Sequence, residues 1–230
     1  MLDYVLISDC HLGSEFIQQD LLLKFLEKIR PLCRNLILVG DIFDFWREKS
    51  KLENISIFKR FVKVTYLPGN HDIEIQYASF LTKGIQRSAI VPIGEVNAFA
   101  THGDIFDKHF GSNILFYELL NKFIYYLSVK LNYDIRTKAQ FLTEWFYQKN
   151  LETMQKVSEN LIGSKYPIVI YGHTHCPGIQ TLNGIQFHNL GSWFESPYCF
   201  CTQGDKYAYY EITESALLPE EKDFHSYRGH

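Results

Sequence analysis

The chain has 230 residues, 46% of them hydrophobic and 21% charged, with a formal net charge of -3; this size suits one domain spanning 1–230, with room for an insertion. The charge balance argues against a surface coated with nucleic acid, so we expect no nucleic-acid partner. The apolar runs fall short of the roughly 18 residues that a membrane-spanning helix needs, and no secretory signal is visible. The five cysteines lack the spacing of a disulfide framework. Together these observations predict a cytoplasmic protein.

Short apolar runs alternate with turn residues along most of the chain, as in an α/β fold. The first run predicts a buried strand at 5–7, and apolar residues at helical spacing predict an amphipathic helix at 20–29 that stops before Pro31. Further strands are predicted at 36–39, 62–67, 97–101, 168–171, 185–190 and 207–212. Most of these strands end beside a glycine and a polar residue, and strand ends are where α/β folds build their sites.

The segment 106–164 interrupts this pattern. It lacks strand signals and predicts two helices, at 113–130 and 137–161, both rich in large aromatic side chains. We interpret 106–164 as a helical insertion within the domain. The stretch from Ser215 onward is polar and is predicted to be a loose tail.

Five short motifs follow the predicted strands and carry oxygen or imidazole donors. They are Asp9-Cys10-His11, Gly40-Asp41, Gly69-Asn70-His71-Asp72, His102-Gly103-Asp104 and Gly172-His173-Thr174-His175. A mixed set of carboxylate, amide and imidazole ligands suits Mn²⁺, Fe or Zn²⁺. Each motif alone is common by chance, and a lone histidine is more often an ordinary core or surface residue. Five in order, each after a buried strand, indicate a metal site.

These motifs resemble the pattern of the calcineurin-like metallophosphoesterases, which is D-x-H, G-D, G-N-H, H and G-H-x-H in that order. The resemblance covers the chain from Asp9 to His175. It implies a sandwich of two mixed β-sheets flanked by helices, with a helical lid insertion, and a centre for two divalent metal ions. One ion would be held by Asp9, His11, Asp41 and His175. The other would be held by Asp41, Asn70, His102 and His173, with Asp41 as the bridge.

The same resemblance implies two catalytic residues beside the metals. His71 would contact the phosphate and assist the leaving group, and Asp72 would orient His71. Two divalent metals suit this chemistry because they neutralise charge on a phosphoryl group and lower the pKa of water. A carboxylate such as Asp41 is a natural bridge, since its two oxygens can bind two ions.

A closer resemblance concerns the substrate. The stretch 40–46 is similar to the G-D-x-F-D/E-x-W signature of UDP-2,3-diacylglucosamine pyrophosphohydrolases of bacterial lipid A synthesis, and Leu190-Gly191-Ser192-Trp193 matches their L-G-x-W element. The resemblance implies cleavage of that lipid-linked nucleotide to UMP and 2,3-diacylglucosamine 1-phosphate, usually with Mn²⁺. Trp46, Arg136 and Lys138 are candidate substrate contacts. The enzyme would work at the cytoplasmic side, in peripheral contact with the inner membrane.

Two departures from that family bear on the substrate: G-N-H-D stands where the best-known members have G-N-R-D, and Cys176 stands where they have arginine. The aromatic insertion would suit acyl chains, because burying each CH₂ group contributes about 0.8 kcal/mol to binding. Aromatic residues at helical spacing are, however, also common in helices that simply pack into a hydrophobic core. The alternative function is therefore a phosphodiesterase or phosphatase acting on a nucleotide or another small phosphoester. A non-enzymatic binding module would be expected to lose metal ligands, and none is missing here.

Overall fold

The structure is a computed structural model. It describes residues 1–43, 56–72, 86–106, 126, 130, 140–161 and 165–227, and within 140–161 it describes side chains at 148 and from 150 onward. Among the described residues, no helix is both long enough and apolar enough to cross a membrane.

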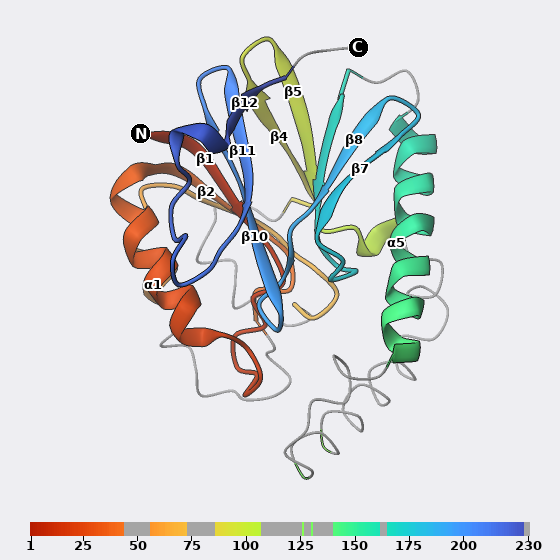
Figure 1. Ribbon diagram of the computed structural model, residues 1–230, viewed down its shortest axis with the longest axis horizontal. Coiled ribbons are helices and arrows are strands. Elements are labelled where there is room, and N and C mark those ends of the chain that lie inside the picture. The colour runs from red at the N-terminus through yellow and green to blue at the C-terminus, as the bar shows by residue number, and fades with distance from the viewer. Residues whose placement is uncertain are drawn as a thin grey trace.

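Two mixed β-sheets form the centre of the molecule (Figure 1). The first has the order β12-β11-β10-β1-β2-β3, with β9 paired to β10, and comprises β1 (Leu2–Ile7), β2 (Cys33–Val39), β3 (Val64–Leu67), β9 (Gly191–Ser192), β10 (Ser196–Gln203), β11 (Lys206–Glu211) and β12 (Phe224–Ser226). The second has the order β4-β5-β6-β8-β7 and comprises β4 (Ser88–Ile93), β5 (Val96–Thr101), β6 (Ile168–Tyr171), β7 (Gly178–Leu182) and β8 (Ile185–Asn189).

Helices cover the outer face of each sheet, so the fold has four layers (Figure 1). The amphipathic helix α1 (Gln19–Ile29) buries Phe25 and Leu26 against β1 and β2 of the first sheet. The helix α5 (Gln140–Leu161) packs Met154 and Val157 on the outer face of β6 and β8. Between the sheets, apolar side chains from both inner faces form a third cluster: Leu6, Ile37, Val39, Leu67, Val91, Ile93, Ala98, Ala100, Ile168, Ile170, Leu190, Phe200 and Tyr207.

Parallel pairing brings the strand ends together at one edge of the sandwich. In the first sheet β1, β2 and β3 run parallel, and in the second sheet β5, β6 and β8 do. The carboxyl ends of β1, β2, β3, β5 and β6 lead directly into the five polar motifs. The fold therefore gathers residues that are as much as 166 positions apart in the chain, such as Asp9 and His175.

The predicted α/β fold class is confirmed, and each predicted strand coincides with an observed one. The helix at 20–29 is also confirmed as α1. The sequence did not indicate β4, β7, β9, β10 or β12. Pro92 and Pro197 weaken the strand signal of β4 and β10, and β7 lies at a sheet edge, where its side chains are only partly covered.

The prediction of a loose tail from Ser215 onward was wrong for residues 215–227. This segment contains a 3-10 turn, η4 (Glu221–Asp223), and the strand β12, which pairs with β11. Leu217, Leu218 and Phe224 pack against the apolar cluster that α1 forms with the first sheet. A few apolar side chains are thus enough to hold this polar segment against the sheet. The segment also pairs with β11, which would otherwise be an open sheet edge.

Most of the predicted insertion lies outside the described residues, including nearly all of the predicted helix at 113–130. The second predicted helix, 137–161, corresponds to α5 over 140–161. Since α5 is one of the four layers, the end of the predicted insertion is part of the sandwich itself.

Candidate metal centre

The seven predicted metal ligands lie together at the edge where the parallel strands end. Asp9 and His11 follow β1, Asp41 follows β2 and Asn70 follows β3 in the first sheet; His102 follows β5, and His173 and His175 follow β6 in the second. Groups of donor atoms that lie within 4.8 Å of one another include Asp9 with His11 and His175, and Asp41 with His102 and His173.

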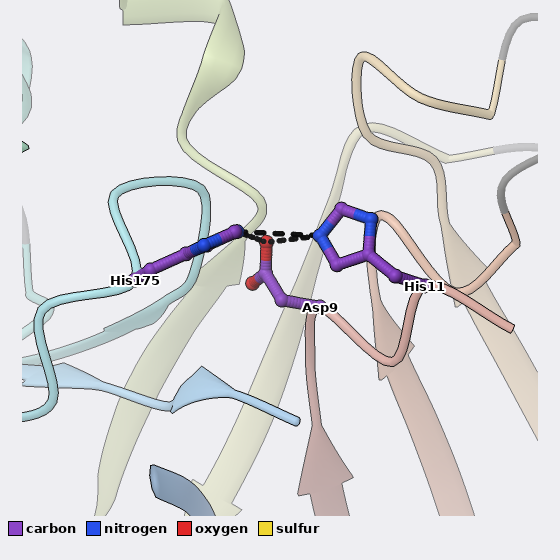
Figure 2. A group of neighbouring side chains, drawn as sticks. All are labelled: Asp9, His11 and His175. Atoms are coloured by element: carbon purple, nitrogen blue, oxygen red, sulfur yellow. Dashed lines mark hydrogen bonds and ion pairs between the residues drawn. The ribbon is translucent and has the colours of Figure 1, made fainter. Parts of the chain in front are cut away.

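The first group is built around the carboxylate of Asp9 (Figure 2). The Nε2 atom of His175 lies 3.1 Å from Asp9 Oδ1, and the Nε2 atom of His11 lies 3.7 Å from the same oxygen. The two Nε2 atoms are 3.2 Å apart. Three donors therefore point at one small volume from two different sheets.

The second group is built around Asp41 and Asn70. The Nε2 atom of His102 lies 3.3 Å from Asp41 Oδ2 and 3.4 Å from Asn70 Oδ1. The Nδ1 atom of His173 lies 2.8 Å from the same Asn70 oxygen. The amide oxygen of Asn70 thus lies between two imidazoles, and the four predicted donors converge.

The imidazole of His102 is oriented as a metal ligand requires. Its Nδ1 atom lies 2.9 Å from the carbonyl oxygen of Val39, which can only accept a hydrogen bond, so Nδ1 carries the donated proton. In neutral His102 the lone pair is then on Nε2, which faces Asp41 and Asn70. A backbone carbonyl that fixes the other ring nitrogen is the usual partner of a ligating histidine.

Backbone strain is concentrated at the same residues. Six non-glycine residues of the described chain have positive φ, and five of them are predicted ligands: Asp9 (48°), His11 (46°), Asp41 (51°), His173 (67°) and His175 (54°). Left-handed conformations disfavour side chains with a Cβ atom and persist where surrounding contacts enforce them, commonly at functional sites. The strain therefore marks the centre independently of its donor chemistry.

Two glycines give the ligands the space that they occupy. A Cβ atom on Gly69 would overlap Asp41 Oδ1 and the ring of His102, and a Cβ atom on Gly172 would overlap Ser8 Oγ and Asp9 Oδ2. Each glycine therefore allows a backbone segment to lie directly against one group of donors.

The buried charges of the centre favour ionised carboxylates. Burial by itself would raise the pKa of Asp41, but the nearby imidazoles of His102 and His71 outweigh burial and hold the pKa well below its ordinary value. The pKa of Asp9 is lowered in the same way, with His175 as the largest influence opposing burial. Both carboxylates are thus deprotonated at neutral pH, the form that binds a cation.

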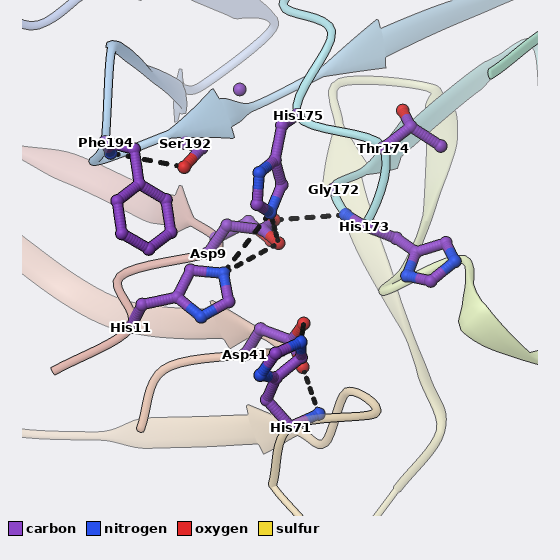
Figure 3. A network of polar contacts seen from close by, with 12 residues as sticks. Asp9, His11, Asp41, His71, Gly172, His173, Thr174, His175, Ser192 and Phe194 are labelled. Carbon is purple, nitrogen blue, oxygen red and sulfur yellow. Dashed lines mark hydrogen bonds and ion pairs between the residues drawn. The ribbon is translucent and has the colours of Figure 1, made fainter. Parts of the chain in front are cut away.

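The two predicted catalytic residues occupy different places. His71 lies at the centre: its Nε2 atom is 3.9 Å from Asp41 Oδ2, and its ring meets that of His11 edge to face at 4.9 Å (Figure 3). Its backbone N–H donates to Asp41 Oδ1 at 2.7 Å. Asp72 is buried, and its carboxylate accepts hydrogen bonds from the backbone N–H groups of Asp41 (2.7 Å), Gly69 (2.8 Å) and Phe43 (3.3 Å).

Sequence reasoning missed two neighbours of the ligands. The hydroxyl of Ser8 lies 2.5 Å from both Asp9 Oδ2 and the carbonyl oxygen of Val39. The ring of Phe194 lies 4.9 Å from that of His11 and 6.0 Å from that of His175, so it forms an apolar wall beside the first group (Figure 3). Phe194 directly follows the L-G-x-W element, so that motif was the sequence feature that could have indicated its place beside the ligands.

The predicted substrate contacts are not among the described residues, and Cys176 and His188, which were not predicted as ligands, have other surroundings. Trp46, Arg136 and Lys138, the predicted substrate contacts, lie outside the described residues. The thiol of Cys176 donates to the carbonyl of Thr174 at 3.2 Å, and burial raises its pKa to about 11. His188 lies in the core among the rings of Phe200, Tyr207 and Tyr209.

The fold and the motif order define a family. The model of the calcineurin-like phosphoesterase superfamily domain matches residues 2–214, and the chain belongs to this superfamily. Among solved structures, a Vps29 single mutant from Entamoeba histolytica aligns with a TM-score of 0.53 over 99% of this chain and 100% of that one; at 16% identity this likeness concerns the fold alone.

Curated relatives share a more specific name. The chain is 25% identical to the UDP-2,3-diacylglucosamine hydrolase of Wigglesworthia glossinidia brevipalpis, over 83% of this chain and 86% of the relative. It is 28% identical to the enzyme of the same name from Blochmanniella floridana, over 74% of this chain and 81% of the relative.

Proposed function

We propose that the protein is a hydrolase with a two-metal centre that cleaves the pyrophosphate of UDP-2,3-diacylglucosamine, giving UMP and 2,3-diacylglucosamine 1-phosphate. The observation that carries this proposal is the pair of adjacent donor groups, one around Asp9 and one around Asp41, within a phosphoesterase fold. The names of the curated relatives support the substrate.

The residues present fit two divalent ions. Asp9, His11, Asp41 and His175 would hold one, and Asp41, Asn70, His102 and His173 the other. When bound, such ions neutralise charge on the phosphoryl oxygens and lower the pKa of a nearby water. The mixed oxygen and nitrogen donors are compatible with Mn²⁺, which we propose as the native metal, and also with Fe or Zn²⁺.

His71 would act on the substrate directly. The side chain of His71 is 12% exposed, whereas the nearby side chain of Asp41 is 2% exposed. The imidazole of His71 is therefore more accessible from solvent than the carboxylate of Asp41. An imidazole in this place can donate a hydrogen bond to an oxygen that gains negative charge as the P–O bond breaks.

Asp72 would position the ligand loops. By accepting the N–H groups of both Asp41 and Gly69, its carboxylate ties the loop after β2 to the loop after β3. We therefore propose that Asp72 sets the distance between Asp41 and Asn70, in addition to the orientation of His71 expected from the family resemblance.

The apolar side of the substrate would be held by segments outside the described residues, around Trp46 and in the predicted insertion with Arg136 and Lys138. A substrate with two acyl chains would place the protein in peripheral contact with the cytoplasmic face of the membrane. Phe194 offers an apolar surface at the rim of the first donor group.

The test is to incubate the purified protein and Mn²⁺ with UDP-2,3-diacylglucosamine and to measure UMP release by chromatography. We expect metal-dependent UMP formation, and no activity from the Asp41→Ala variant. Absence of UMP together with metal-dependent hydrolysis of bis-p-nitrophenyl phosphate would favour the nucleotide or small-phosphoester alternative. Absence of both activities would contradict the proposed function.

A further inference from the structure

A buried asparagine of α5 contacts the loop that carries two of the proposed ligands. Asn150 is 1% exposed, and its Oδ1 atom accepts hydrogen bonds from the hydroxyl of Tyr171 at 2.6 Å, the hydroxyl of Thr174 at 2.8 Å and the Nδ2 amide of Asn189 at 3.3 Å. One side-chain oxygen on a helix therefore receives donors from β6, from the loop after β6 and from β8.

The loop residue in this network is placed between the ligands. Thr174 is completely buried, separates His173 from His175, and accepts a second hydrogen bond from Asn189 Nδ2 at 2.8 Å. Thr174 is thus fixed both as a donor and as an acceptor, while its two neighbours direct their rings to the other side of the loop, toward Asp9 and Asn70 (Figure 3).

The loop needs such an anchor because its backbone is strained. His173 and His175 both have positive φ, at 67° and 54°. Such a conformation is energetically unfavourable for a residue with a Cβ atom, and it persists only where surrounding contacts enforce it. The hydrogen bonds of Thr174 are contacts of this kind, since they fix the residue between the two strained ones.

We propose that Asn150 is a positioning residue of the metal centre, through which helix α5 holds the loop of His173 and His175 in the conformation that binds metal. The proposal rests on the proposed function, because it requires that these histidines bind a divalent ion. It assigns to α5, the helix that ends the predicted insertion, a direct influence on metal affinity. The ordinary alternative is that Asn150 merely anchors the helix to the core.

A second buried polar contact of α5 offers a matched control. The hydroxyl of Ser158, which is completely buried, accepts a hydrogen bond from Asn183 in the turn between β7 and β8 at 2.8 Å. This contact also joins α5 to the second sheet, but it does not involve the ligand loop. Loss of helix anchoring alone would therefore affect Ser158→Ala and an Asn150 variant alike.

The experiment is a titration of the metal-free full-length protein with Mn²⁺, in which electron paramagnetic resonance measures the free ion. Asn150→Leu, which keeps the size but removes the acceptor, should weaken Mn²⁺ binding by about 10- to 100-fold, the usual effect of losing a residue that orients a ligand. Asn150→Asp keeps the acceptor and should recover most of the affinity. Ser158→Ala should bind Mn²⁺ like the wild type even where its unfolding temperature is lower.

Thr174→Val gives an independent measurement if Asn150→Leu does not fold. It removes the hydroxyl from the other end of the same hydrogen bond, so it should weaken Mn²⁺ binding to a similar extent. Where Asn150→Leu does fold, the double variant should be little worse than either single one. Wild-type affinity in Asn150→Leu or Thr174→Val, or an equal loss in Ser158→Ala, would overturn the positioning role. Failure of the wild type to bind Mn²⁺ would instead contradict the proposed function.

Discussion

The proposed ligands are recognisable by backbone conformation as well as by chemistry. Asp9, His11 and Asp41 in the first sheet, and His173 and His175 in the second, all have positive φ. Residues with a Cβ atom adopt this conformation only rarely, although Asp and His do so more often than most. The simplest physical reason is that it aims the side chains at a shared point, as the proposed metal centre requires.

Gly172 provides a test at this scale. A Cβ atom on this residue would overlap the carboxylate of Asp9, so Gly172→Ala should displace Asp9 or the His173–His175 loop. We expect Mn²⁺ affinity to fall at least about tenfold in a calorimetric titration. Gly184→Ala is the control for the added methyl group: a Cβ atom there would meet no atom within 4 Å, although this glycine, unlike Gly172, has a positive φ of +77°. Equal Mn²⁺ affinity in the two variants would show that Gly172 is not needed for space.

His71 provides a second test, because it lies close enough to His11 and Asp41 to be a ligand itself. If it acts on the substrate, His71→Ala should lower turnover of bis-p-nitrophenyl phosphate by roughly 10²- to 10⁴-fold and leave the bound metal unchanged. Metal content is measured by elemental analysis of the dialysed protein. Loss of bound metal from the variant would make His71 a ligand and remove it from the proposed catalytic role.

At the scale of elements, the parallel strands were predictable because they are short apolar runs, most of which end beside a glycine and a polar residue. The loop after β6 shows the limit of this reasoning. His173 and His175 stood out as donors, whereas the contact of Thr174 with Asn150 joins residues 24 positions apart and has no local signal. The polar tail shows the opposite error, since Phe224 is held by pairing of β12 with β11, which only the assembled sheet makes available.

His188 on β8 gives a prediction about stability and pH. Burial among three aromatic rings lowers its pKa to about 3, and neither ring nitrogen has a hydrogen-bond partner within the described structure. In the unfolded chain the pKa returns to about 6.5. Below pH 6.5 the unfolded state therefore takes up a proton that the folded state refuses until about pH 3, so stability falls as the pH falls through this window.

The variant His188→Leu, which is similar in volume, should lose this dependence. Between pH 7 and pH 5 the wild type should lose roughly 1–2 kcal/mol more unfolding free energy than the variant. Urea denaturation at both pH values, with EDTA present so that metal binding does not contribute, measures the difference. Parallel pH dependence in the two proteins would mean that the pKa of His188 is the same in the folded and unfolded states.

At the scale of the whole molecule, the candidate centre joins the two sheets. The group around Asp9 takes Asp9 and His11 from the first sheet and His175 from the second, and the group around Asp41 combines Asp41 and Asn70 with His102 and His173 in the same way. Each proposed ion would therefore have ligands from both halves of the sandwich. The sequence predicted the ligands and the layers separately, and only the fold shows that the site lies where the sheets meet.

The central claim is that two divalent ions bind at this junction and share Asp41. The most direct measurement is an anomalous difference map from crystals of the wild-type protein grown with Mn²⁺. We predict two peaks per chain, one beside His11 and His175 and the other beside His102 and His173, with the Asp41 carboxylate in contact with both. A single peak at the junction, or no peak there while Mn²⁺ binds elsewhere, would contradict the two-metal centre.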